Sequence, residues 1–356
     1  MKVRLIAVAA LLFVAATILF TVFVFKPAKP IIDIKGETLL VIAKASSEAI
    51  TVKVTNTLFT SWVAMALLLT FAIAATRKPA LIPSGLYNFF EAILEGILNF
   101  VSGIAGEHNG RRFFPVIATF FIYITFANWL SLTPLFNTIG VFEPLGAEKE
   151  EFHRNAVVFK DTGGVSMILS GAKSITVEAA ECDKLTGHEA DACREEAIVK
   201  ATAGKVKENE KVGVLAPYFR GINTDLMTPL SFALVSAFFV EYWGISTLGF
   251  FRYAGKFVNL RGPIDFFVGF LELIAEMARL ISFSFRLFGN MMAGEILLLV
   301  MTFLVALCTP ILLFFYGLEL FVGMIQAFVF GTLTLVFAML AVSHHGPAEH
   351  AEEGHQ

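Results

Sequence analysis

The distribution of apolar positions predicts a chain that crosses a membrane several times. A helix needs about 20 mainly apolar residues to cross a hydrocarbon core roughly 30 Å thick. Four segments of that kind lie at residues 5–25, 57–76, 114–135 and 229–251. Two longer apolar stretches follow them, at residues 264–307 and 311–342. The predicted fold class is therefore an all-α polytopic membrane protein of about six hydrophobic helices.

The last two apolar segments are predicted to form a long tilted hairpin. Thr309 and Pro310 join them, and proline cannot continue a helical hydrogen-bond ladder. At about 1.5 Å per residue the two helices would be about 66 Å and about 48 Å long, well beyond the hydrocarbon thickness. Helices of that length must tilt, leave the membrane or break, and a tilted pair suits wrapping around a curved partner.

Basic residues set the expected topology. They gather at the segment ends that the positive-inside rule assigns to the cytoplasm: Lys2, Arg4, Arg77, Lys78, Arg111, Arg112, Arg252, Lys256 and Arg261. Both termini are then cytoplasmic, and the chain lies in a bacterial plasma (inner) membrane. The expected parts are an anchor (1–30), a short external segment (31–56), two spans with a cytoplasmic amphipathic helix (57–136), an external insert (137–223), a core containing the hairpin (224–343) and a cytoplasmic His/Glu tail (344–356).

Two of these parts leave alternatives open. The first apolar run could be a cleaved signal peptide, but it exceeds the usual length of about 7–15 residues and no A-x-A sequence closes it. In the insert, Cys182 and Cys193 lie in an oxidising compartment, where they form either a disulfide or two thiols on an exposed helix. Between Pro83 and Gly106, polar residues recur at spacings of three and four, which indicates the amphipathic helix.

The composition agrees with a membrane protein and excludes several other classes. Apolar residues make up 56% of the chain, charged residues make up 16%, and the mean hydropathy is +0.73. A net charge of -3 leaves no basic surface for a nucleic-acid backbone. The three cysteines lack zinc-site spacing, and the chain has no G-x-x-x-x-G-K-[ST] phosphate loop. We therefore expect no metal, no cofactor and no bond chemistry catalysed by the chain itself.

One stripe of the fifth apolar segment is polar. Steps of three, four and seven place these residues on one helix face: Glu272, Glu276, Arg279, Ser282, Arg286 and Asn290. A charge at bilayer depth costs at least about 2.5–3.5 kcal/mol, so the stripe should face protein or water and mark an ion pathway. Arg286 stays protonated at any relevant pH and is thus a permanent cation inside the membrane.

Carboxylates on three segments extend this polar set. Glu295 lies nine residues after Arg286, on the other side of the same helix, and Glu319 shares a face of the next helix with Gln326. Each carboxylate alone could be a satisfied interhelical hydrogen-bonding group, but together with Arg286 they indicate a hydrated, titratable lining. Glu241 in the fourth segment is either a channel residue or a buried hydrogen-bonded group.

Several short sequences resemble one known family. The run from Phe285 to Glu295, FRLFGNMMAGE, resembles the R-L-F-G-N-x-x-A-G-E motif of subunit a of F-type ATP synthases. Three further matches follow the family order: N-x-L-x-x-x-P at 128–134, A-D-[IVL] at 224–226 and Q-A-F-I-F at 326–330. The resemblance covers about residues 57–137 and 222–342.

This resemblance implies a stator channel subunit whose hairpin packs against the rotor's c-ring. Arg286 would favour the ionised form of the rotor carboxylates and block leakage between two offset half-channels. The outer half-channel would be lined by Glu295, Glu319, Gln326, Asn290 and Asp225, and the cytoplasmic one by Ser282, Glu272 and Glu276. The implied partners are the c-ring, b-type peripheral stalk subunits, the whole F1Fo complex and membrane lipid, with ATP synthesis on soluble subunits.

Some residues depart from the family pattern. Many bacterial members have a histidine where Glu319 stands, so Glu295 and Glu319 form a carboxylate pair that could share a proton. Met227 stands where the family commonly has an asparagine. Proton and sodium coupling both remain open. The main alternative is a self-contained transporter that binds an anion at Arg286, although the chain lacks the internal repeats typical of that class.

Overall fold

The structure is a computed structural model, and part of the chain is described in it. The described residues are 38–44, 51–77, 85–133, 136, 139–144, 155–160, 166–167, 174–177, 182, 188–202, 210–250, 253, 255, 263–305 and 310–343. The expected anchor at 1–30, the third cysteine, Cys308, and the tail at 344–356 lie outside these residues.

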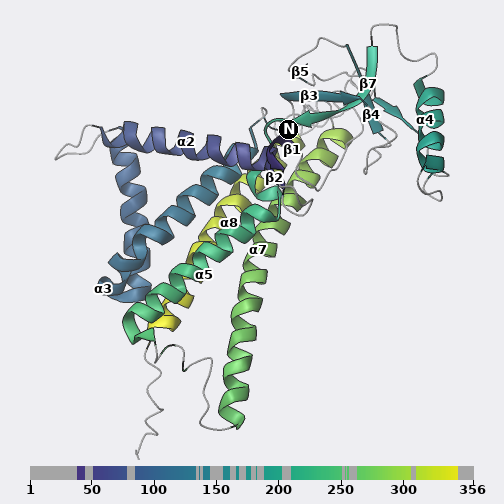
Figure 1. Ribbon diagram of the computed structural model, residues 1–356. Helices are drawn as coiled ribbons and strands as arrows, with labels where there is room; N and C mark the ends of the chain where they lie inside the picture. The colour runs from purple at the N-terminus through teal and green to yellow at the C-terminus, as the bar shows by residue number, and fades with distance from the viewer. Residues whose placement is uncertain are drawn as a thin grey trace, which may run out of the picture. The chain divides into compact units, whose positions relative to one another are not determined.

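Long helices dominate the described part of the chain (Figure 1). They are α2 (Asn56–Thr76), α3 (Leu86–Ser131), α5 (Met227–Leu248), α7 (Pro263–Val305) and α8 (Pro310–Val342). Four of them, α2, α3, α5 and α8, are long and apolar enough to cross a membrane. Helix α7 carries six charged residues along its length. The helices confirm the expected all-α polytopic membrane fold.

The membrane helices expose large apolar side chains. Ile73 on α2 is 60% exposed, Phe238 on α5 is 66% exposed and Leu313 on α8 is 75% exposed. In water such surfaces would be costly, whereas in a bilayer they lie against lipid chains and every helical backbone group is already satisfied. The exposed apolar faces thus agree with a chain embedded in lipid.

Helix α3 consists of two helices that meet at Gly106. This glycine has φ 74° and ψ 164°, a backbone conformation that only glycine adopts readily. The segment before it is the one whose polar spacing predicted an amphipathic helix, and the segment after it contains the apolar run of residues 114–131. Gly106 therefore separates two helical segments of different polarity.

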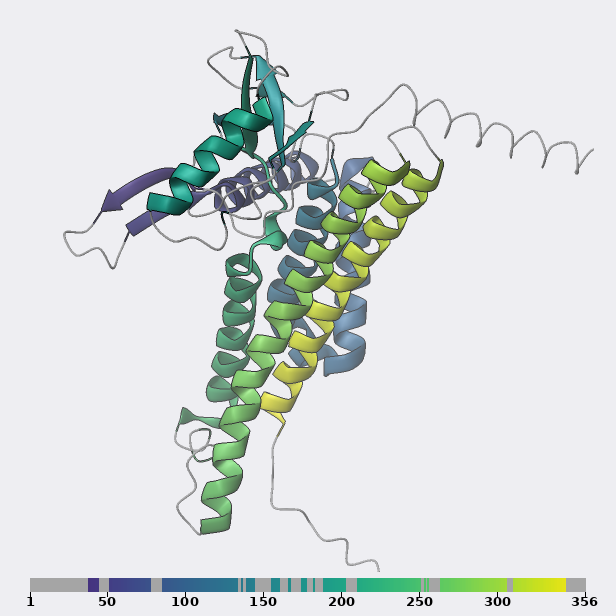
Figure 2. The same ribbon diagram turned by 90° about the vertical axis from the view of Figure 1, so that its right-hand side faces the viewer.

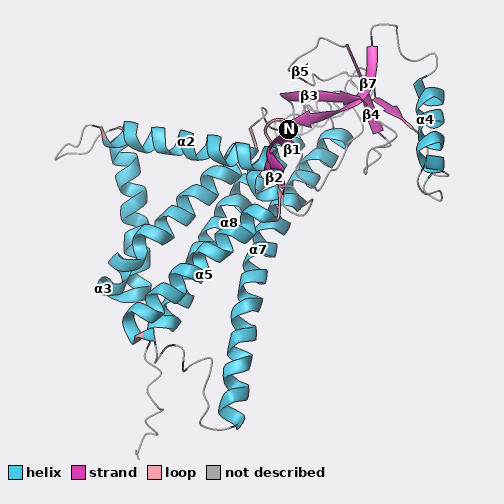
Figure 3. Cartoon of the chain, in the orientation of Figure 1, coloured by secondary structure: helices cyan, strands magenta, loops and turns pink. Residues whose placement is uncertain are grey.

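A five-stranded sheet lies between α3 and α5 in the chain (Figure 3). Its strands are β3 (Ile139–Pro144), β4 (Asn155–Lys160), β5 (Ser166–Met167), β6 (Ser174–Thr176) and β7 (Glu210–Pro217). They follow the order β5-β3-β7-β4-β6, and each neighbouring pair is antiparallel. Sequence analysis assigned no strands to this insert. A separate hairpin, β1 (Thr38–Lys44) and β2 (Thr51–Thr55), leads directly into α2.

The insert also contains α4 (His188–Thr202) and a disulfide. The disulfide joins Cys182 to Cys193 of α4, with Cα atoms 5.6 Å apart. Cys182 and Val177 are buried, and Ile198 of α4 packs against them. The disulfide and this small apolar cluster attach α4 to the chain that follows β6.

The chain divides into two compact units. Unit 1 comprises residues 1–64, 127–225 and 289–323, and unit 2 comprises residues 65–126, 226–288 and 324–356. Unit 1 thus contains the strands, the end of α7 and the start of α8. Unit 2 contains most of α3, all of α5 and the remaining parts of α7 and α8.

Aromatic packing forms the core of unit 2. Phe113 of α3 and Trp243 of α5 are buried, with ring centroids 4.5 Å apart. Phe283 of α7 packs against Phe330 and Phe337 of α8, at centroid distances of 5.2 and 5.7 Å. These contacts bring α7 and α8 side by side in this unit, as Figure 2 shows. Helix α8 begins at Pro310, the residue that predicted the turn of the hairpin.

Candidate functional site

A polar cluster in unit 1 is built around Glu319 of α8. The Glu319 side chain is 3% exposed, and its Oε1 atom accepts no hydrogen bond from the described residues. Its carboxylate lies against the backbone of Gly294 on α7, where an added Cβ would collide with it. The absence of a side chain at position 294 therefore creates the space that the carboxylate occupies.

Glu295 approaches the same cluster from the residue after Gly294. Its side chain is half-buried, and an added Cβ on Gly221 would lie 3.6 Å from its Oε2 atom. Gly221 precedes the short 3-10 helix η2 (Ile222–Thr224), whose residues are all buried. The segment before α5 thus packs close to Glu295 of α7. The residue before Glu295 is Gly294, which accommodates the Glu319 carboxylate.

An amide pair completes the cluster. The Nδ2 atom of Asn223 in η2 donates to Oδ1 of Asn128 on α3 at 2.6 Å, and both side chains are buried. Asn128 in turn donates to the backbone oxygen of Gly323 at 3.0 Å, one helical turn after Glu319. We call Asn128, Asn223, Glu295 and Glu319 the unit 1 cluster.

Asp225 lies in the same unit, at the start of α5. Its Oδ2 atom accepts a hydrogen bond from the hydroxyl of Thr57 on α2 at 3.0 Å. The neighbouring Asn56 donates from Nδ2 to the backbone oxygen of Pro217 at 3.2 Å. Met227, which stands where the related family commonly has an asparagine, is 71% exposed. The buried amide of this segment is therefore Asn223, four residues earlier.

Unit 2 contains an ion pair beside a cavity. Arg279 Nη1 donates to Glu276 Oε1 at 2.8 Å, and the two side chains are 22% and 15% exposed. The guanidinium also lies 3.7 Å from the centroid of the Phe337 ring, a cation–π contact. The cavity has a volume of about 110 Å³, and Glu272, Glu276 and Arg279 contribute to its lining. This volume admits several water molecules.

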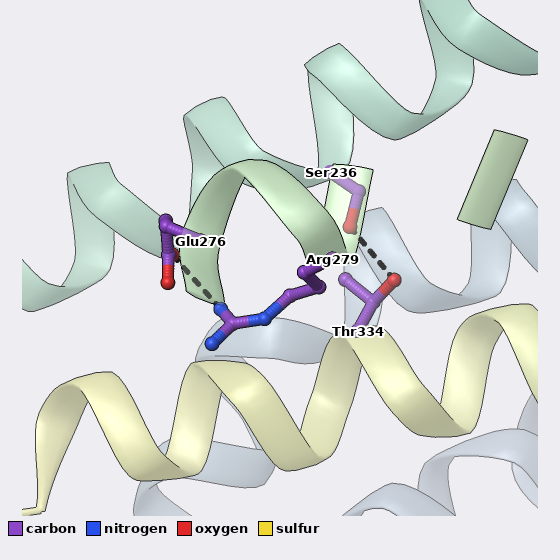
Figure 4. A network of polar contacts seen from close by, with 4 residues as sticks. All are labelled: Ser236, Glu276, Arg279 and Thr334. Atoms are coloured by element: carbon purple, nitrogen blue, oxygen red, sulfur yellow. Dashed lines mark hydrogen bonds and ion pairs between the residues drawn. The ribbon is translucent and has the colours of Figure 1, made fainter. Parts of the chain in front are cut away.

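The ion pair within α7 lies close to a polar contact that joins α5 and α8 (Figure 4). The hydroxyls of Ser236 on α5 and Thr334 on α8 are 2.8 Å apart, and both side chains are buried. Thr334 also donates to the backbone oxygen of Phe330 at 2.9 Å. This hydroxyl pair satisfies two groups that would otherwise be costly to bury between α5 and α8.

Tyr253, which follows α5, also lines the unit 2 cavity. The side chain is 4% exposed, and its ring lies against Gly244, where an added Cβ would be 2.5 Å from the ring. Its hydroxyl is hydrogen-bonded to Glu241 of α5. Burial first, and then this hydrogen bond, raise the pKa of the Tyr253 phenol above its usual value. The phenol consequently stays protonated and acts as a donor.

The middle of α7 presents a polar face outward. Ser282, Arg286 and Asn290 follow one another at four-residue steps, and all three are exposed. The fixed positive charge of Arg286 is therefore accessible to a partner that packs on α7.

The structure places some of the residues selected from sequence in one unit and separates others. Glu295, Glu319 and Asp225 belong to unit 1, where Glu319 lies against Gly294 and Glu295 lies near Gly221, whereas Gln326 is buried in unit 2. Glu272 and Glu276 line the unit 2 cavity. Sequence reasoning did not select Asn223 or Tyr253. A buried amide near Asp225 could have been suspected, but no sequence signal indicates that Tyr253 folds back onto Gly244.

Comparisons with known proteins agree with the motifs. The model of the family described as "ATP synthase A chain" matches residues 58–339. ATP synthase subunit a of Helicobacter pylori strain Shi470 is 25% identical over 279 residues, which cover 78% of this chain and 84% of the relative. ATP synthase subunit a of Helicobacter acinonychis gives the same values. ATP synthase subunit a of Desulfosudis oleivorans is 25% identical over 290 residues, covering 80% and 86%.

Proposed function

Because the chain belongs to the ATP synthase A chain family, we propose that it supplies the two offset half-channels that couple proton flow to rotation. Membership of this family makes it a multi-pass membrane subunit of the Fo sector that takes part in proton translocation and catalyses no bond chemistry itself. The proposal concerns which of its residues carry protons, and how.

The unit 1 cluster is assigned to the outer half-channel. Its support is the Glu319 carboxylate buried against Gly294, the residue before Glu295, and the amides of Asn128 and Asn223 on the segments that pack nearby. Amides donate and accept hydrogen bonds, and the Glu319 Oε1 and Asn223 Oδ1 atoms accept none from the described residues. Water entering this cluster would find acceptors for its protons. Asp225, Asn290 and Gln326 complete the proposed outer lining.

The unit 2 cavity is assigned to the cytoplasmic half-channel. It is large enough for water, and Glu272 and Glu276 line it, while Arg279 fixes the orientation of Glu276 through the 2.8 Å ion pair. Ser282 lies further along the same helix on its exposed face. A proton released from the rotor would reach the cytoplasm through this cavity.

Arg286 is the proposed barrier between the two paths. Along α7 it lies between Glu276, which lines the unit 2 cavity, and Glu295 in the unit 1 cluster, and its side chain is exposed. This order along one helix is the observation that carries the proposal. A permanent cation at that position favours the ionised form of each arriving rotor carboxylate and repels a proton moving directly between the paths.

The rest of the mechanism follows from that barrier. A rotor carboxylate loses its proton near Arg286, takes up another from the second path, and carries it through almost a full turn of the c-ring. The proposed partners are the c-ring, b-type peripheral stalk subunits and the soluble head of F1Fo. The proposed location is the bacterial inner membrane, with both termini cytoplasmic. Family membership favours this function over a self-contained anion transporter.

An Arg286→Ala substitution tests the proposal. In inverted membrane vesicles that contain the assembled complex, ATP-driven acidification should fall to background while ATP hydrolysis by the soluble head continues. The matched control is Arg111→Ala, since the Arg111 side chain is 73% exposed and forms an ion pair with the exposed Glu107.

The control should acidify the vesicles at the native rate. A protonophore that abolishes the signal, with a sodium ionophore that does not, would identify the proton as the coupling ion. Native acidification by the Arg286→Ala complex would overturn the assignment of Arg286 as the barrier.

A further inference from the structure

We propose that Glu241 accepts protons in the unit 2 cavity and that Tyr253 is the residue that positions it. This inference rests on the proposed function of that cavity as a half-channel. It adds a carboxylate from α5 and a phenol from the chain after α5 to a path otherwise lined by α7 carboxylates. Neither residue belongs to the motifs that carry the family resemblance.

The Tyr253 ring has one well-defined position. It fits against Gly244, because the absence of a side chain there leaves a notch in the face of α5. Trp243 and Val240 are buried in the same apolar core as Tyr253, and packing in this core restrains the ring. The phenol is thus held at the cavity wall by packing, independently of its hydrogen bond.

Glu241 is one helical turn before Gly244, on the same face of α5. The Tyr253 hydroxyl is hydrogen-bonded to its carboxylate, which directs the carboxylate toward the residue that lines the cavity. Its Oε1 atom is buried and has no further hydrogen-bond partner among the described residues. Glu241 does not line the cavity itself but is hydrogen-bonded to Tyr253, which does. A carboxylate with a free buried acceptor atom, one residue away from a cavity that admits water, is suited to take up a proton.

The charged groups around this pair come from several helices. Helix α7 contributes Glu272, Glu276 and Arg279 to the cavity, and α8 contributes only the apolar residues Phe337, Leu340 and Ala341. Arg112 of α3 binds elsewhere on α5, donating to the hydroxyl of Thr247 at 2.9 Å, and does not line the cavity. Because Arg279 is already paired with Glu276, Glu241 relies on the phenol rather than on an ion pair.

The proton step is a simple exchange with water. A hydronium ion in the cavity transfers its proton to the Glu241 carboxylate, leaving a neutral carboxyl group and a water molecule. The carboxyl group then returns the proton to the next water along the path. The Tyr253 hydroxyl donates to the carboxylate before the transfer and keeps it oriented throughout, so the phenol itself neither gains nor loses a proton.

The experiment compares substitutions at both positions in the assembled complex in inverted vesicles. Glu241→Gln should lower the initial rate of ATP-driven acidification about tenfold, and Glu241→Asp should restore part of it. Tyr253→Phe keeps the ring in its notch and removes only the hydroxyl. It should change the pH dependence of the rate between about pH 6 and about pH 9 without lowering the amount of assembled complex.

Two control variants and a comparison with Arg286→Ala show whether this inference or the proposed function fails. Tyr242→Phe and Glu107→Gln alter exposed residues of the same types and should leave both rate and pH dependence unchanged. If Arg286→Ala abolishes acidification while Glu241→Gln and Tyr253→Phe act as the native complex does, the proposed function stands and this inference fails. A Tyr253→Phe complex with less assembled protein and a native pH dependence would assign the phenol a purely structural role and also overturn the inference.

Discussion

At the residue scale, Gly294 and Glu319 depend on each other. The carboxylate of Glu319 is buried against the Gly294 backbone, in the space that a side chain would fill. Neighbouring Glu295 carries the second carboxylate of the unit 1 cluster. One residue without a side chain therefore decides whether the Glu319 carboxylate can lie against α7.

A Gly294→Ala substitution should displace the Glu319 carboxylate. We expect a loss of about 1–3 kcal/mol in stability, because an overpacked buried site forces side chains from their preferred rotamers. Thermal unfolding of the purified complex would measure the loss, and acidification of inverted vesicles should slow several-fold. Gly317→Ala on α8, where an added Cβ meets nothing within 4 Å, is the matched control. Equal behaviour of the two variants would contradict the packing described for Glu319.

Sequence reasoning was most informative about single residues in strong motifs. The spacing along α7 placed Arg286, Ser282 and Asn290 on one face, and all three are exposed together. Sequence reasoning could not identify Asn223 as the buried amide near Asp225. The burial of Asn223 depends on how η2 packs against Asn128, which lies 95 residues earlier in the chain. Such contacts between distant segments leave no periodic signal.

At the element scale, the break in α3 separates two helical segments of different polarity. Gly106 adopts a positive φ of 74°, while Gly103, three residues earlier, lies within regular helix. The apolar and polar spacing on either side of residue 106 predicted the change of segment but not the conformation that produces it. A helix that continued straight through this point would carry the amphipathic segment into line with the apolar one.

A Gly106→Ala substitution should destabilise the protein, and Gly103→Ala is its matched control. At both positions an added Cβ would meet no atom within 4 Å. The cost of Gly106→Ala should be about 1–3 kcal/mol, since alanine is strained at this φ and ψ. Gly103→Ala should instead be neutral or stabilise by about 1 kcal/mol, because alanine favours helix over glycine. The melting temperature should therefore fall in the Gly106→Ala variant and stay the same or rise in the Gly103→Ala variant. A shift of the same sign and size in both would mean that α3 is continuous.

The helices could be predicted from the sequence, but the five-stranded sheet could not. The helices were predictable because lipid-facing segments need long apolar runs, and α8 starts at Pro310 as the proline indicated. The sheet was not, because its strands are short and irregularly spaced between residues 139 and 217. The central strand β7 pairs with β3, about 70 residues before it, and such long-range pairing depends on tertiary context.

At the scale of the whole molecule, the chain combines membrane helices with a folded insert held by a disulfide. The insert has its own sheet, and Cys182, Val177 and Ile198 form a small apolar cluster of their own. Asn223 stands at the end of the insert, whereas the carboxylates proposed to carry protons lie on α7, α8, α5 and the segment before α5, outside the sheet and α4. The insert and the proton path should therefore respond separately to perturbation.

Removing the disulfide tests that separation. Cys193→Ser should destabilise the attachment of α4 by about 3 kcal/mol, the entropy expected for closing a loop of this length. Limited proteolysis should then cut near α4 faster, with cleavage products that mass spectrometry can assign. ATP-driven acidification should stay at the native rate. A parallel loss of acidification would show that the insert is coupled to the proton path.

The close packing of Gly294 and Glu319 also limits how related proteins can diverge. A larger residue at position 294 is costly while a glutamate remains at 319, because the two side chains would compete for one space. A prior change of position 319 to a shorter or differently directed side chain removes that cost. The two sites should consequently vary together among descendants of this protein, and the order of their replacements should be the same in each branch.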